Sequence, residues 1–107
     1  MNFDIVKNAL LTVTDKVYHY RAYNATDKYI VWAEDGQATA LWAENKMQNQ
    51  VIEGTIDYFT KSENDPAPEQ IQNALNNSGI SWRLNSIQYE DNTKLIHYEW
   101  VWQIWLE

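Results

Sequence analysis

The sequence predicts one α+β domain over residues 1–107, in which two helices cover one face of an antiparallel sheet of about five strands. Apolar residues follow helical spacing in two segments and strand-like patterns in five others, in the order α-β-β-β-α-β-β. Helices that are separate from hairpin-linked strands usually pack together on one side of the sheet. A chain of 107 residues also has the length of a single domain.

The first helix is expected over residues 2–12. Its apolar positions recur every three or four residues, which is the spacing of one helix face. They are Phe3, Val6, Ala9, Leu10 and Val13. The polar stretch Thr12–Asp15 then ends the helix.

The next two segments are predicted strands joined as a hairpin. Residues 17–22 (VYHYRA) alternate between two sides, and residues 29–34 (YIVWAE) are rich in β-branched and aromatic side chains. The intervening Tyr23–Lys28 contains Asn24 and Asp27, which favour turns. We interpret this stretch as a hairpin loop.

An ambiguous segment over residues 36–47 separates these strands from a third. Ala and Leu favour helix there, yet the segment opens on Gly36 between strong strand patterns, so we expect a long exposed connection. The third strand, 50–60, places one alternate set of residues on a shared face: Ile52, Gly54, Ile56 and Tyr58. Glycine inside a strand indicates a bulge or a close backbone approach at Gly54.

The clearest break in the chain, KSENDPAP, precedes the second helix. Either Asp65 or Ala67 could cap this helix, with Pro66 or Pro68 at its first position. Gly79 occupies the place of a C-terminal stop. Strands 80–89 and 94–106 follow, and the turn residues Glu90–Thr93 predict an antiparallel hairpin.

Charge and composition exclude several partners and cofactors. The formal net charge is −7, and the eight basic residues are scattered singly, which disfavours direct nucleic-acid and membrane binding. The absence of cysteine excludes disulfides, thiol catalysis and Cys-based zinc sites, and favours synthesis inside the cell. The N-terminus does not resemble a signal peptide, and no stretch reaches membrane-spanning length.

The sequence predicts neither an active site nor a bound cofactor. The three glycines are far apart, so no phosphate loop is formed, and no nucleophile elbow or metalloprotease motif occurs. His19 and His97 could bind a metal with a carboxylate such as Asp57 or Glu99, but half-exposed strand histidines are the more frequent case. A second group of acidic residues could bind a divalent cation, although a solvated acidic loop is the more frequent case. These residues are Glu34, Asp35 and Glu44.

The final strand is unusually rich in tryptophan. Trp100 and Trp102 share a face with Ile96, Tyr98, Ile104 and Leu106, which indicates a core row covering the helices. An aromatic platform for stacking a sugar or a base is the alternative, although base binding favours basic neighbours and this strand carries Glu99 and Glu107.

Four residues are candidates for a subunit or partner interface. Trp105 lies on the opposite face of the last strand, and a large aromatic such as Trp42 on a connection is enriched at protein contacts, or else closes over the sheet edge as a lid. The predicted interface set is Trp42, Lys46, Met47 and Trp105.

Several segments together resemble small tail-component proteins of tailed phages and prophages of low-GC Gram-positive hosts, of the tail-terminator (tail-completion, head–tail joining) type. These segments are VYHYRA, YIVWAEDG, GTIDYFTK, ISWRLNSIQYE and IHYEWVWQIW, so the resemblance covers nearly the whole chain. No interface residue carries over by motif.

The resemblance implies a virion protein that is made in the bacterial cytoplasm and has no enzyme chemistry. Such α+β subunits form a ring, commonly a hexamer, that ends tail-tube growth and joins tail to head. Its partners would be other copies of itself, a tail-tube protein and a head-connector protein. In such a ring, acidic side chains would suit a lumen that passes DNA, because like charges do not adhere. The alternative function is a small aromatic-face binding module for a carbohydrate or peptide.

Overall fold

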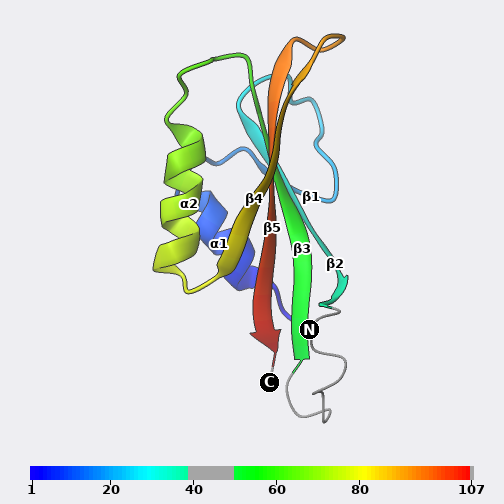
Figure 1. Ribbon diagram of the computed structural model, residues 1–107, viewed down its shortest axis with the longest axis vertical. Coiled ribbons are helices and arrows are strands. Elements are labelled where there is room, and N and C mark those ends of the chain that lie inside the picture. The colour runs from blue at the N-terminus through cyan, green and yellow to red at the C-terminus, as the bar shows by residue number, and fades with distance from the viewer. Residues whose placement is uncertain (39–49, 107) are drawn as a thin grey trace.

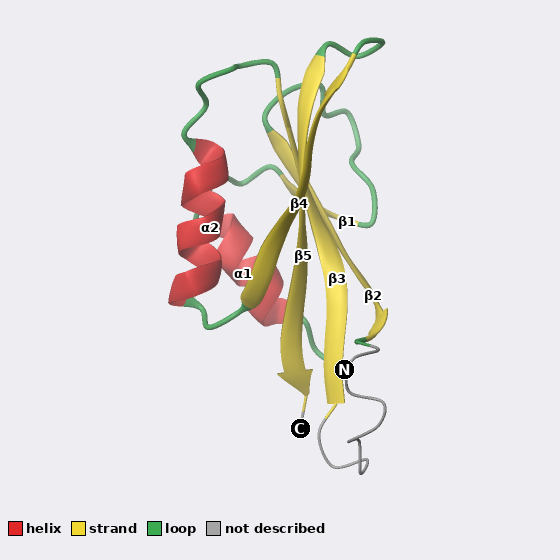
Figure 2. Cartoon of the chain, viewed as in Figure 1, coloured by secondary structure: helices red, strands yellow, loops and turns green. Residues whose placement is uncertain are grey.

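The computed structural model describes residues 1–38 and 50–106 and contains two layers, a sheet and a pair of helices on one of its faces (Figures 1 and 2). The helices are α1 (Asp4–Leu11) and α2 (Ala67–Asn77). The strands are β1 (Val17–His19), β2 (Tyr29–Gln37), β3 (Gln50–Thr60), β4 (Ser81–Glu90) and β5 (Leu95–Leu106). Within the described residues they form one sheet of order β1-β2-β3-β5-β4, which confirms the α+β class and the predicted element order.

The sheet is mixed, because β1 pairs with β2 in parallel and not as the predicted hairpin. Val17 lies opposite Ile30 and His19 opposite Trp32. The reason lies in residues 20–28, where Tyr20, Asn24 and Lys28 adopt positive φ angles of 72°, 57° and 55°. These left-handed residues turn the chain far enough for it to re-enter the sheet in its original direction. Strand β1 also ends at His19, before the predicted Ala22.

The remaining strand pairs are antiparallel, as predicted. Strand β3 pairs with both β2 and β5, and β4 pairs with β5 as the expected hairpin. Two register shifts interrupt the ladders, one between Glu34 and Gly36 in β2 and one between Leu84 and Ser86 in β4. Each shift inserts one extra residue, so the side-chain alternation of that strand reverses beyond it.

Helix α2 has well-defined ends. The Asp65 carboxylate accepts hydrogen bonds from the Ala67 N–H, at 2.9 Å, and from the Tyr58 hydroxyl, at 2.7 Å. The helix starts at Ala67 and its N-cap residue is Pro66, so neither Asp65 nor Ala67 is the cap, and neither proline is the first helical residue. The Asp65 side chain lies one residue before the cap and accepts its hydrogen bond from the first helical N–H. Gly79 has a φ of 71°, and the hydrogen bonds Gly79 N–H to Asn76 O and Ile80 N–H to Leu75 O form a Schellman motif.

The core lies between the helices and the adjacent face of the sheet. Trp100 and Trp102 are fully buried there, in contact with a cluster that also contains Val6, Ala9, Leu10, Ile30, Trp32, Ile52, Ile56, Tyr58, Ile71, Ala74, Leu75, Ile80 and Ile104. Gly54 is part of this arrangement: a Cβ atom there would collide with the Ala33 carbonyl oxygen and lie 2.5 Å from the Trp102 ring. The predicted close approach at Gly54 is confirmed, and the bulge is on the neighbouring strand β2.

Candidate functional site

The helices cover only one side of the sheet, and the opposite side is called here the outer face (Figure 2). Of the four predicted interface residues, Trp42, Lys46 and Met47 lie outside the described residues. Trp105 lies on the outer face, opposite Val51 of β3, and is 64% exposed. The exposure of Trp105 agrees with its predicted position, and its role in an interface stays a prediction.

An acidic row runs along the outer face and consists of Asp35, Glu53, Asp57 and Glu99. Asp57 and Glu99 lie directly opposite each other on β3 and β5. Glu53 accepts a hydrogen bond from the Gln103 amide at 3.1 Å, and Glu99 accepts one from the Asn85 amide at 3.0 Å. Glu53 and Glu99 therefore each have a neutral amide as hydrogen-bond donor, whereas Asp57 lies 2.6 Å from His97 Nε2.

The charges of the acidic row act on one another. Burial raises the pKa of Asp57, and the nearby charges of Glu99 and Asp35 raise it further, although its hydrogen bond with His97 lowers it. Burial likewise raises the pKa of Asp35, and the charges of Glu53, Glu99 and Glu34 add to this effect. Mutual repulsion of this kind makes the row a concentrated source of negative potential.

The two histidines do not meet, in contrast to the metal-site hypothesis. His97 Nε2 lies 2.6 Å from the Asp57 carboxylate, and its Nδ1 lies 3.2 Å from that of Glu90. His19 is on β1, which β2 and β3 separate from β5; its ring stacks on Trp32, and its Nε2 lies 2.7 Å from the Glu34 carboxylate. In residues 1–38 and 50–106, no group of three or more potential ligands is arranged to hold a metal ion.

The predicted acidic cation site is also divided. Burial works against the charged form of Glu34, but hydrogen bonds from its own backbone, His19 and Tyr20 outweigh it and lower the pKa of Glu34. Asp35, the extra residue of the β2 bulge, instead interacts with the acidic row. Glu44, the third proposed ligand, lies outside the described residues.

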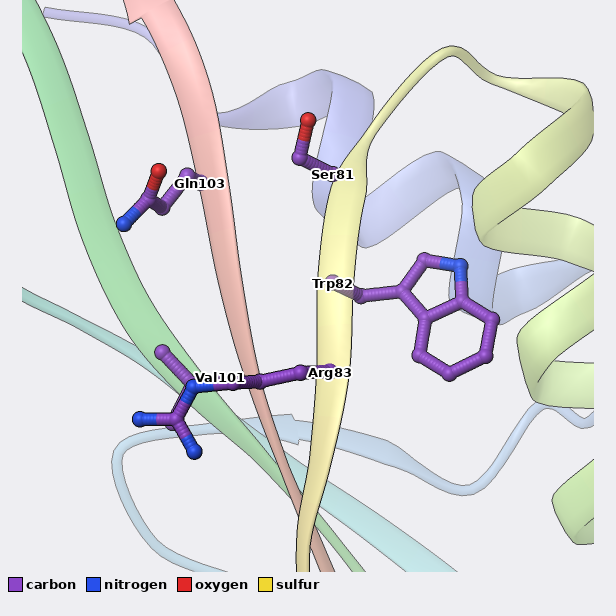
Figure 3. Close-up of a pocket in the computed structure, with 5 residues that line it drawn as sticks. All are labelled: Ser81, Trp82, Arg83, Val101 and Gln103. Carbon is purple, nitrogen blue, oxygen red and sulfur yellow. The ribbon is translucent and has the colours of Figure 1, made fainter.

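A shallow pocket of about 170 Å³ lies on the outer face between β4 and β5, lined by Ser81, Trp82, Arg83, Val101 and Gln103 (Figure 3). Arg83 extends across Val101 and donates a hydrogen bond to the side-chain Oδ1 of Asn85 at 2.8 Å. The Trp82 ring points away from the pocket toward α2, and its indole N–H donates a hydrogen bond to Asn76 Oδ1 at 2.8 Å. The lining offers one hydroxyl, one guanidinium and one amide, and no acid–base pair to activate Ser81.

The tryptophan row of β5 is a core row, as predicted. Trp100 and Trp102 have no exposed surface, and their indole N–H groups donate to Gln72 Oε1 at 3.1 Å and to the Thr55 carbonyl at 3.0 Å. A stacking platform requires an accessible ring face. The aromatic-face binding module is therefore contradicted for these two residues.

The sequence did not predict an exposed apolar patch that lies on the helix side of β4. It consists of Leu84, Ile87 and Tyr89, which are 41%, 55% and 57% exposed. The β4–β5 hairpin extends beyond the end of α2 in Figure 1, so no helix covers this part of the strand. The register shift after Leu84, which the strand pairing in the structure shows, moves the odd-numbered residues of β4 to the helix side.

Beside this patch lies a groove, called here the hairpin groove, with a volume of about 710 Å³. It is lined by Lys61, Glu63, Tyr89, Lys94 and Ile96. Among the described residues, neither Lys61 nor Lys94 forms an ion pair. The hairpin groove thus combines an apolar floor with two free positive charges and one negative charge.

Comparison with known proteins gives a fold relationship. No protein-family model matches the chain, and no curated protein does. A chain of the structure described as "Virion of native gene transfer agent (GTA) particle" has a similar fold, with a TM-score of 0.56 and 12% sequence identity. The match covers 92% of this chain and 88% of that chain. Among the described residues, no helix is long and apolar enough to cross a membrane.

Proposed function

We propose that this protein is a non-enzymatic structural subunit of a tailed phage or prophage particle, and that it is a ring-forming tail terminator. The observation that carries the proposal is the fold match to a chain of a gene transfer agent virion, because it extends over 92% of this chain and 88% of that one. A match of this extent relates the whole subunit, not a shared motif. In this role the protein is made in the bacterial cytoplasm, ends tail-tube growth and contacts a head-connector protein.

The distribution of exposed groups supports an assembly role. In residues 1–38 and 50–106, one face of the sheet carries no covering layer, β4 is an edge strand, and three large apolar residues on that strand are exposed. An uncovered edge strand with exposed apolar residues favours pairing with another chain. The described pockets, by contrast, carry no convergent catalytic groups.

The acidic row supports a place for part of the outer face within the ring. We propose that Asp57 and Glu99, at the middle of this face, line the lumen through which DNA passes. Negative walls reduce adhesion of the negatively charged backbone. The Glu99→Lys variant is therefore expected to bind DNA more tightly than wild type in low salt, whereas a matched reversal at an exposed helix position, Glu69→Lys, is not.

The assembly test uses the purified chain and the tail-tube protein of the same phage or prophage. Native mass spectrometry is expected to detect one closed oligomer, with the hexamer as the expected size. Added to growing tubes, the protein is expected to shorten them and to appear at one tube end in electron micrographs. A chain that stays monomeric at its highest soluble concentration and leaves tube length unchanged would contradict the proposal.

A further inference from the structure

We infer that successive copies of this chain join head to tail, with the Trp105 end of the outer face on one copy entering the hairpin groove of the next. The inference rests on the proposed ring, and it names the two surfaces that form the ring contact. It follows from a match between two exposed surfaces in apolar content, charge and position.

The first surface is the Trp105 end of the outer face. Trp105 is 64% exposed although it is a large apolar residue at the end of a regular strand. Glu53 lies on the neighbouring strand β3, two ladder pairs from Trp105 and on the same face, and Asp35 lies near Glu53. An exposed tryptophan beside negative charge is a typical anchor of a protein interface.

The second surface is the hairpin groove together with the adjoining patch. Tyr89 and Ile96 provide an apolar floor, and the exposed Ile87 extends it along β4. Lys61 and Lys94 stand at the groove without ion-pair partners in the described part of the chain, and Glu63 lies beside them. The chain has eight basic residues and a net charge of −7, and two of these basic residues line the same groove as the aromatic ring of Tyr89.

The charge pattern selects a second copy as the occupant. The surface that fits the hairpin groove must be apolar at its centre and acidic at its rim, and the Trp105 end has both properties. Truncating the rim charges would alter the rate and salt dependence of assembly, whereas truncating the aromatic centre would alter its strength.

Geometry prevents one molecule from satisfying both surfaces itself. Ile96 and Trp105 are nine residues apart on β5, a separation of about 30 Å at the rise of a strand. They also lie on opposite faces, because one is even-numbered and the other odd-numbered along an unbroken strand. Each copy therefore presents one donor surface and one acceptor surface, which is the requirement for a heterologous contact that closes into a ring.

The test uses two complementary variants of the full chain. Trp105→Ser removes the donor, and Ile87→Ser with Tyr89→Ser removes the acceptor. Each is expected to weaken self-association by at least about 30-fold, the effect of truncating an interface hot spot. Tyr23→Ser is the matched control, because Tyr23 is 63% exposed and lies on neither surface.

Mixing the two variants separates this contact from a symmetric one. The donor-deficient copy keeps its groove and the acceptor-deficient copy keeps Trp105, so native mass spectrometry of an equal mixture should detect 1:1 dimers and no larger ring. A ring that survives in both variants would overturn the inference while leaving the proposed function intact. A wild-type chain that never assembles would contradict both.

A charge exchange tests the rim and does not depend on removing apolar groups. Lys61→Glu with Lys94→Glu is expected to abolish the ring at physiological salt, and a second chain carrying Glu53→Lys and Asp35→Lys is expected to bind this variant better than it binds itself. Lys16→Glu, at an exposed position outside the groove, is the control. Failure of the exchanged pair to associate in preference to either self-pairing would contradict the assigned surfaces.

Discussion

The two faces of β5 use the same residue type for opposite purposes. Trp102 has no exposed surface, packs over Gly54 and donates its N–H to the Thr55 carbonyl, whereas Trp105, three residues later, is 64% exposed. Tryptophan content alone therefore does not identify a binding platform on this strand. Position on one face or the other decides whether the ring stabilises the fold or is free for a partner.

The largest expected difference between the two faces is the loss of stability when each tryptophan ring is truncated. Trp102→Ala removes a fully buried aromatic, and we expect it to reduce the free energy of unfolding by about 3–5 kcal/mol. Trp105→Ala is expected to change it by less than about 0.5 kcal/mol in the monomer. Urea denaturation at a concentration that keeps both variants monomeric checks the difference, because assembly would add its own stabilisation. Equal losses would mean that both faces belong to the core.

The close packing of the Trp102 ring against Gly54 can also be tested by substitution. Gly54→Ala would place a methyl group against the Ala33 carbonyl and the Trp102 ring, and we expect a loss of about 1–3 kcal/mol from overpacking. Gly36→Ala is the matched control, since no atom of the described part of the chain lies within 4 Å of a Cβ there. Near-ultraviolet circular dichroism should show a changed tryptophan environment for Gly54→Ala alone. A neutral Gly54→Ala substitution would contradict the close packing.

The core face was predictable from the sequence because its pattern is local. Alternation over 50–60 and 94–106, the helical spacing of Val6 and Leu10, and the stop at Gly79 each depend on neighbouring residues only. Burial of one face then follows from the strand period, whatever the partner strand. The positions of Trp100, Trp102 and Trp105 on their respective faces followed in the same way.

The errors arose where backbone conformation departs from that period. The parallel pairing of β1 depends on left-handed Tyr20 and Lys28, residue types that rarely adopt positive φ, so residues 20–28 gave no sign of it. The apolar patch of β4 depends on the extra residue at the bulge, which reverses the faces of Ile87 and Tyr89 relative to Trp82. The acidic row was only partly visible, because Asp35 joins it through the β2 bulge.

The smallest expected effect concerns the charges of the outer face. The pKa of Asp57 is raised chiefly by burial and further by Glu99, so the folded chain binds this proton more tightly than the unfolded chain does. The contribution of this carboxyl group to the free energy of unfolding is therefore fully present below the ordinary Asp pKa of about 3.9. It is lost as the pH rises through the raised pKa of the folded chain.

Glu99→Gln removes one of the charges that cause this decline and retains the oxygen that accepts the Asn85 hydrogen bond. We expect the pKa of Asp57, followed by carbon-13 NMR of its carboxyl group, to fall toward its ordinary value. Stability at neutral pH should rise by no more than about 0.5 kcal/mol. The matched change Glu69→Gln, on an exposed helix position, should leave the Asp57 titration unmoved. An unchanged Asp57 pKa in Glu99→Gln would mean that the two carboxylates are screened from each other. The outer face would then lack a concentrated negative potential. The proposal that this face lines the lumen depends on that potential.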